Sequence, residues 1–186
     1  MAKYCHLHQP ANTLGLFTMV IVLKEPRGIA LDSQGNYIVC DAGNGCVRFI
    51  SPQGNIFKTI GYGFLLEPLN CVCFENKIFV SDGEAHLVKV FNSNGRYLYQ
   101  FGRQGSGDGE FQRPYGLAID KTGHLLVCGF NSNRIQVLTL EGDFVTKFGN
   151  YGGKLGEMMG PTDISVLKSG HFVVCEFKNN RLQIFE

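Results

Sequence analysis

Acidic and basic residues recur at matching positions along this 186-residue chain. Arg181 follows Glu176 by five residues, across a short loop. A guanidinium and a carboxylate facing each other across a tight loop can pair as a fork and hold the loop in place. Arg134 stands at the corresponding place, but Gly129 replaces the acid. We therefore expect Arg134 either to borrow a carboxylate from a neighbouring unit, such as Asp82, or to be free for a ligand.

Two other segments show the reverse arrangement. Asp41 and Asp82 provide the acid, but Cys46 and Leu87 stand where the arginine would be. These two segments therefore have the acid without the arginine, and the segment 129–134 has the arginine without the acid.

Catalytic chemistry has few candidates. His124 and His171 each follow a turn glycine, which makes them turn residues rather than metal ligands. His6 and His8 have a spacing that can chelate on a strand, but no partner carboxylate is identifiable. The sequence has no Ser-His-Asp set, phosphate-binding loop or paired-carboxylate motif. We expect no catalytic residue, no metal and no cofactor, and keep a metal-dependent lyase as the remote alternative.

Composition narrows the class of partner and the compartment. Seventeen Lys and Arg residues against sixteen Asp and Glu give a net charge of +1, so nothing indicates binding to DNA or to an anionic membrane. The seven cysteines include no C-x-x-C pair, and reduced thiols of a cytoplasmic protein are the simplest interpretation. The apolar segment 14–23 is too short to span a bilayer as a helix, and we expect a β-strand over 17–24.

An internal repeat organises the elements that must position these residues. Pro26, Pro68, Pro114 and Pro161 are 42, 46 and 47 residues apart. A cysteine follows the first, third and fourth proline by fourteen residues, which indicates packing rather than redox chemistry. A period in the forties with four short strands per copy is typical of a β-propeller blade.

The third copy is the most complete. Its strands are expected at 116–119, 125–128, 134–138 and 144–148, separated by glycine-containing turns. The fourth copy stops at Glu186, after its third strand, and therefore lacks an outer strand.

These copies resemble the NHL repeat, whose blades read P-x-G-[IL]-A-[VI]-D and later N-x-R-[IL]-Q-V-F. The third copy has "PYGLAID" and "NRIQV", the fourth "NNRLQIF", the first "PRGIALD" and the second "AHLVKVF". The linker "GSGDGEFQRP" also looks like the family's link between blades. The resemblance covers Glu25 to Glu186 and is greatest to the propellers at the C-terminus of tripartite-motif (TRIM-NHL) ubiquitin ligases. It implies an all-β propeller.

The chain departs from the family in blade number, since NHL propellers typically close with about six blades. We expect a poorly patterned N-terminus over 1–14 and a propeller region over 15–186, with repeats at about 25–61, 67–102, 113–149 and 160–186. An arc of a larger, about six-bladed propeller is favoured over a closed four-bladed ring completed by 17–24. No RING or B-box pattern precedes the repeats, so no ligase chemistry is carried over.

The resemblance implies a binding function on one rim, built by the linkers into the inner strands and by the loops between the second and third strands. Binding residues usually lie on such loops of a rigid scaffold. The candidates are Arg27, Asn70, Arg113, Tyr115, His86, Asn133, Arg134, Lys178 and Arg181. A protein partner is expected, for instance as the substrate-recognition part of a ubiquitin-ligase-type protein. An RNA-binding propeller acting in post-transcriptional regulation is the alternative. Asn44, Asn131 and Asn180 are expected to serve their turns.

Overall fold

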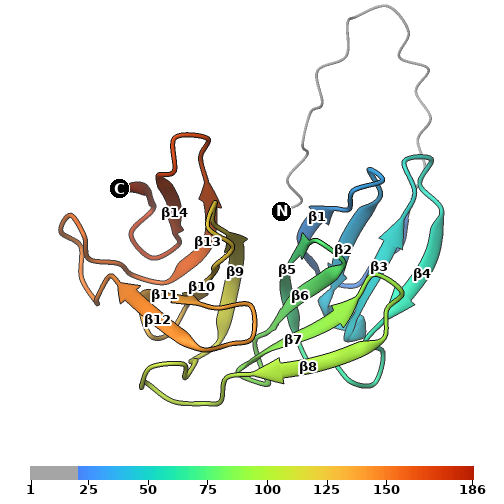
Figure 1. The fold of residues 1–186 in the computed structure, drawn as a ribbon, viewed down its shortest axis with the longest axis horizontal. Helices are drawn as coiled ribbons and strands as arrows, with labels where there is room; N and C mark the ends of the chain where they lie inside the picture. Colours follow the sequence, from blue (N-terminus) through green and yellow to red (C-terminus); the bar gives the residue numbers. More distant parts are fainter. Residues whose placement is uncertain (1–20) are drawn as a thin grey trace, which may run out of the picture.

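The computed structural model describes residues 21–186, which form four antiparallel sheets in a row (Figure 1). We call these sheets blades 1 to 4, in chain order. The first sheet holds β1 (Pro26–Leu31), β2 (Tyr37–Asp41), β3 (Cys46–Ile50) and β4 (Ile56–Ile60), with a 3-10 turn at Ala42–Asn44. The second holds β5 (Pro68–Phe74), β6 (Lys77–Asp82), β7 (Leu87–Asn92) and β8 (Tyr97–Phe101). The third holds β9 (Pro114–Ile119), β10 (Leu125–Gly129), β11 (Arg134–Leu138) and β12 (Phe144–Phe148). The fourth holds only β13 (Pro161–Val166), β14 (Phe172–Glu176) and β15 (Arg181–Phe185). The expected all-β propeller of four blades, the last incomplete, is confirmed.

Side chains close the turns between the first two strands of a blade. Asp120 Oδ1 accepts the backbone N–H groups of Thr122 and His124, at 2.8 and 2.9 Å. Gly123, between them, has a φ of +86°, a conformation that glycine adopts without steric cost. Blade 1 repeats this arrangement around Asp32. The hairpins thus follow directly from the short polar sequences between the apolar runs.

The inner strands pack on one another in chain order, β1 against β5, β5 against β9 and β9 against β13. Two glycines make this close approach possible. A Cβ on Gly28 would lie 2.6 Å from Asn70 Cα, and a Cβ on Gly116 would lie 2.6 Å from Asp163 Cα. The second residue after the repeat proline is therefore glycine in one blade and a larger polar residue in the next.

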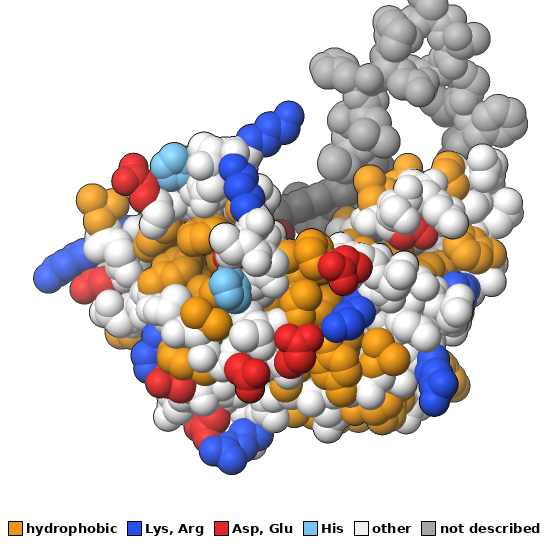
Figure 2. Space-filling model, in the orientation of Figure 1, with side chains coloured by type: hydrophobic (Ala, Val, Ile, Leu, Met, Phe, Trp, Pro, Cys, Tyr) orange, Lys and Arg blue, Asp and Glu red, His pale blue; other side chains and the backbone are white. Residues whose placement is uncertain are grey.

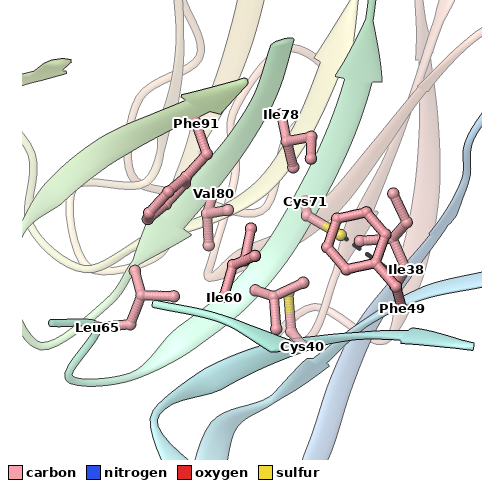
Figure 3. Close-up of a cluster of buried hydrophobic side chains, with 10 residues drawn as sticks. Ile38, Cys40, Phe49, Ile60, Leu65, Cys71, Ile78, Val80 and Phe91 are labelled. Carbon is pink, nitrogen blue, oxygen red and sulfur yellow. Dashed lines mark hydrogen bonds between the residues drawn. The ribbon is translucent and has the colours of Figure 1, made fainter. Parts of the chain in front are cut away.

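Three hydrophobic clusters join neighbouring blades. Figure 3 shows the first, in which Ile38, Cys40 and Phe49 of blade 1 face Cys71 and others of blade 2. The other two clusters lie between blades 2 and 3 and between blades 3 and 4. Cys40 and Cys128, from one repeat position, are both fully buried, as expected for packing residues, whereas Cys175 at the same position of blade 4 is only half-buried. All six cysteines of residues 21–186 are free thiols.

The row of blades is an open arc. Blades 1 and 4 form its ends and lie apart in Figure 1. Leu182 and Ile184 on β15 are each 66% exposed. Their counterparts on β11, Ile135 and Val137, pack against blade 4 and are only 0% and 7% exposed. A closed four-bladed ring would bury Leu182 and Ile184 against blade 1. The face of blade 4 is instead uncovered, as expected for an arc of a larger propeller.

Part of the expected strand over 17–24 lies outside the described residues. Residues 21–24 are described and form no strand. Lys24 instead ties the segment to blade 1, because its N–H donates to Asp41 Oδ1 at 2.8 Å and its carbonyl accepts the N–H of Gly43 at 2.8 Å. His6, His8 and the segment 1–14 also fall outside the described part. No helix of residues 21–186 has the length and apolar character needed to cross a membrane.

Candidate binding rim

One edge of the arc, which we call the loop rim, brings together the linkers into the inner strands and the loops between second and third strands. The register explains this, since Pro114 at the start of β9 pairs with Gly129 at the end of β10. Pro161 pairs in the same way with Glu176 at the end of β14. Candidate residues that are more than ten positions apart in the sequence therefore meet at one edge.

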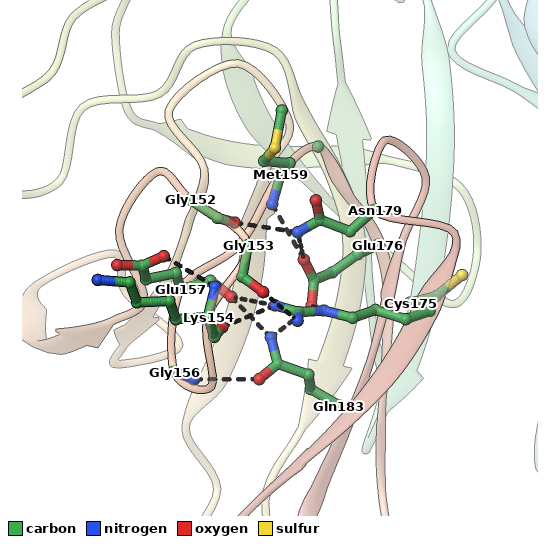
Figure 4. Close-up of polar contacts among 12 residues, drawn as sticks. Gly152, Gly153, Lys154, Gly156, Glu157, Met159, Cys175, Glu176, Asn179 and Gln183 are labelled. Carbon is green, nitrogen blue, oxygen red and sulfur yellow. Dashed lines mark hydrogen bonds and ion pairs between the residues drawn. The ribbon is translucent and has the colours of Figure 1, made fainter.

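A buried carboxylate organises the loop rim of blade 4 (Figure 4). The side chain of Glu176 is fully buried, and its Oε1 accepts Arg181 Nε at 2.9 Å. Its Oε2 accepts Asn179 Nδ2 at 2.6 Å and the backbone N–H of Met159 at 3.0 Å. The expected pairing of Arg181 with Glu176 is confirmed. Because Arg181 also donates to the carbonyls of Gly153, Lys154 and Glu157, it fastens the linker rather than offering its charge to a ligand.

Blades 1 and 2 also have a carboxylate at the repeat position of Glu176, but it pairs with a cation from a different position of the third strand. Asp41 Oδ2 accepts Arg48 Nε at 3.1 Å, and Asp82 Oδ2 accepts Lys89 Nζ at 2.9 Å. The five-residue spacing did not identify either of these two ion pairs. The cation stands seven residues after the acid instead of five. This position is two residues further along the third strand, so its side chain points to the same face.

The ionisation of Glu176 should make the loop rim sensitive to acid. Burial raises the pKa of the Glu176 carboxyl, and hydrogen bonds from Arg181, Gln183 and Asn179 outweigh burial and hold this pKa below its usual 4.5. A carboxyl with a lowered folded-state pKa stabilises the fold above its unfolded pKa, and the stabilisation is lost as pH falls towards the folded pKa. The free-energy advantage of wild type over Glu176→Gln should thus be constant near pH 7 and shrink below about pH 4.5. Urea unfolding of wild type and Glu176→Gln across pH checks this, and a difference that does not shrink below about pH 4.5 would contradict it.

Candidate residues of the second-to-third strand loops clasp the next blade. His86 Nδ1 accepts the backbone N–H of Arg113 at 3.0 Å, and Asn133 Oδ1 accepts the N–H of Gly160 at 2.9 Å. His86 and Asn133 have φ of +58° and +53°, so each occupies the left-handed region in its turn. Both residues therefore hold blades together, whatever else they contact.

Most rim cations are engaged within the chain. Arg113 donates to Glu67 Oε1 at 2.5 Å, and Arg27 lies 3.8 Å from Glu25. Asn70 Nδ2 lies 3.4 Å from Asp163 Oδ1 on the inner strand of blade 4. Arg27 and Arg113 are thus paired with carboxylates of the chain itself.

Arg134 has no carboxylate partner among the described residues. Its two terminal nitrogens donate to the carbonyls of Ser106 at 2.7 Å and Gly107 at 2.5 Å. Of the two alternatives expected for Arg134, pairing with Asp82 is excluded, because Lys89 and the backbone N–H groups of Leu66 and Glu67 occupy that carboxylate.

An aromatic strip of Tyr115, Phe130 and Phe177 runs along the loop rim of blades 3 and 4. The ring centroids of Tyr115 and Phe130 are 5.9 Å apart, and those of Phe130 and Phe177 are 6.5 Å apart. Lys178 Nζ lies 5.1 Å from the centroid of Phe130, and Phe177 is 67% exposed. Figure 2 shows hydrophobic side chains exposed among charged ones in the view drawn.

Sequence reasoning identified Tyr115 and Lys178 but missed the two phenylalanines. The signal was present in the repeat, because Phe130 and Phe177 share the position directly after the second strand. Blades 1 and 2 have Ala42 and Gly83 there.

The opposite edge carries turn residues. His124 Nδ1 lies 2.7 Å from Thr122 Oγ1, and His171 Nδ1 lies 2.6 Å from Ser169 Oγ. Each histidine thus contacts its own turn. Within residues 21–186, no three His, Cys, Asp or Glu side chains are grouped to hold a metal ion.

Comparisons with known proteins agree with this architecture. The NHL repeat model matches residues 23–48 and 158–185, and a 6-bladed beta-propeller model matches residues 63–147. Protein wech of Drosophila melanogaster is 50% identical over 50 residues, which are 27% of this chain and 6% of wech. E3 ubiquitin-protein ligase TRIM71 of Rattus norvegicus is 30% identical over 122 residues, with 60% of this chain and 14% of TRIM71 covered. The chain therefore spans a small part of these relatives' length.

Solved propellers share the fold at low identity. A streptogramin B lyase structure superposes with a TM-score of 0.69 at 15% identity, over 90% of this chain and 56% of the lyase. At that identity the likeness concerns the fold alone. With the four blades, the matching repeat model and these relatives together, the chain is an NHL-repeat β-propeller array whose relatives include TRIM-NHL proteins.

Proposed function

We propose that this propeller arc is a non-catalytic scaffold that binds a protein partner through its loop rim. The observation that carries the proposal is the aromatic strip with Lys178 beside it. Exposed aromatic side chains next to a cation are typical of the residues that dominate protein interfaces. The loop that carries Phe177 is fastened by the buried Glu176–Arg181 pair, so this part of the strip is held rigidly and loses little entropy on binding.

The kinship with TRIM71, a protein named as an E3 ubiquitin-protein ligase, suggests the setting. In a ligase of this kind, a rigid propeller would supply substrate recognition while ubiquitin transfer belongs to another part of the protein. We infer that the arc acts as such a recognition element in the cytoplasm.

RNA is the competing ligand, since aromatic rings also stack on bases. RNA binding draws most of its affinity from cations on phosphates. Arg113 and Arg181 already donate to carboxylates, which favours a protein partner.

A selection from a random displayed peptide library tests the proposal even though the partner is unidentified. Enriched peptides should bind the protein in fluorescence polarisation, with a dissociation constant that changes little between about 50 and 200 mM salt. A single-stranded RNA pool serves as the parallel probe. Failure to enrich peptides, together with RNA binding that weakens steeply with salt, would replace the protein partner with RNA.

A further inference from the structure

Blade 3 repeats the rim frame of blade 4 almost atom for atom. Gly129 pairs with Arg134 as Glu176 pairs with Arg181. Gln136 donates to a linker carbonyl at 2.7 Å and accepts a linker N–H at 2.9 Å, and Gln183 makes the equivalent two contacts. The frame is therefore the same in both blades, and the missing part is the carboxylate.

The absence of that carboxylate leaves polar atoms without partners. Arg134 Nε and Ser132 Oγ are buried and make no hydrogen bond among the described residues. Their counterparts in blade 4, Arg181 Nε and Asn179 Nδ2, both donate to Glu176. A buried donor without a partner has lost its hydration without compensation, and the cost is greater when the donor is charged. Donors for a carboxylate are thus in place beside Gly129 without an acceptor.

We propose that this notch, formed by Gly129, Ser132 and Arg134, binds a carboxylate group supplied by an acidic side chain of the protein partner. The carboxylate takes the place that Glu176 fills in blade 4 and accepts hydrogen bonds from Arg134 Nε and the Ser132 hydroxyl. This assignment rests on the proposed function.

Room for the carboxylate comes from one side-chain rotation. The Ser132 hydroxyl now occupies the space where a Cβ of residue 129 would lie. A serine hydroxyl turns about a single bond between staggered positions, which clears that space. Ser132 and Arg134 are partly exposed at the loop rim, but Ser132 Oγ and Arg134 Nε are themselves buried, so a carboxylate reaches them only as the Ser132 side chain turns aside.

The notch adjoins the aromatic strip in the chain. Phe130 directly follows Gly129, and Lys178 lies over its ring. The geometry therefore suits a partner segment that places an aspartate or glutamate in the notch and an apolar side chain against Phe130.

Acetate is the probe for the notch alone. Sodium acetate should raise the Tm of the wild-type protein by about 2–4 °C over sodium chloride at equal ionic strength, since a ligand that binds only the folded state stabilises it. In NMR spectra, the Arg134 Nε–H signal should shift saturably with acetate while that of Arg181, already paired, stays in place. If neither Tm nor the Arg134 signal responds specifically to acetate, the notch is not a carboxylate site, whether or not peptides bind the rim.

Gly129→Glu supplies the carboxylate in cis, in the register that Glu176 uses. It should raise the Tm in chloride and abolish the acetate response. Gly129→Asp is the second variant should the longer side chain prevent folding, since Asp41 and Asp82 fill this position in blades 1 and 2. Persistence of the acetate response in a folded Gly129 variant would overturn the assignment.

The peptide arm identifies the source of the carboxylate. Peptides enriched on the wild-type rim should contain an acid whose change to the amide weakens binding at least tenfold, and Gly129→Glu should remove this difference. An acetate response without any acid preference among bound peptides would overturn the partner assignment and leave a site for free carboxylates.

Discussion

Replacement of Asp82 by alanine is expected to lower the free energy of unfolding by about 3–5 kcal/mol, because it strips a buried cation of its counter-charge. The side chains of Asp82 and Lys89 are 0% and 6% exposed. In the variant, Lys89 Nζ would keep only the Phe64 carbonyl as a strong partner, at 2.6 Å. The backbone N–H groups of Leu66 and Glu67 would also lose their acceptor. Urea unfolding measures the loss.

Two further variants show whether that loss of stability comes from the unpaired buried charge of Lys89. The double variant Asp82→Ala with Lys89→Met leaves no buried charge and should recover a substantial part of the stability. Asp41→Ala should cost less, because its partner Arg48 is 25% exposed and can be solvated. A loss below about 1 kcal/mol for Asp82→Ala would mean that the pair is no part of the frame that holds the rim.

The second large effect concerns binding. Truncating both Phe130 and Phe177 to alanine should make the binding free energy of the enriched peptides less favourable by about 2–4 kcal/mol, roughly 30- to 1000-fold in dissociation constant. Aromatic side chains at the centre of an interface commonly contribute that much to binding. The free energy of unfolding should fall far less than in Asp82→Ala, because Phe177 is 67% exposed and neither ring pairs a buried charge. Fluorescence polarisation with one enriched peptide measures the dissociation constants of the wild-type protein and of the double variant.

Phe57→Ala is the matched control. Phe57 is 52% exposed on the outer strand β4 and also contacts a second ring, that of Phe49, at 6.1 Å. Its loss should leave peptide affinity unchanged. Equal weakening by Phe57→Ala and by the rim double variant would point to general destabilisation, not to a rim site.

The repeat allowed the fold to be predicted, because four aligned copies fix strand positions through their prolines, turn glycines and alternation. It also predicted the Arg181–Glu176 pair, since that pair is local in sequence. Arg48 and Lys89 were not predicted as partners, because each stands seven residues after its acid and not five. That position is two residues further along the third strand, on the same face. The segment 17–24 was expected to be a strand from its apolar residues alone, whereas Lys24 is bound to the loop of blade 1.

The character of the rim depended on contacts that sequence spacing does not contain. Arg113 reaches Glu67, 46 positions away, so its charge is neutralised within the chain. The rings of Phe130 and Phe177 lie 6.5 Å apart on two blades and form a common surface only when the blades are side by side. Arg134, by contrast, was singled out correctly as lacking an acid in its own blade, and the buried unpaired Nε is the structural counterpart of that observation.

Mapping a bound peptide onto the protein by amide chemical shifts is the most direct test of rim recognition. We predict that the shifts concentrate at residues 113–115, 129–134 and 177–181, which carry the aromatic strip and the notch. Shifts centred instead on the opposite edge, at 120–124 and 167–171, would contradict recognition through the loop rim.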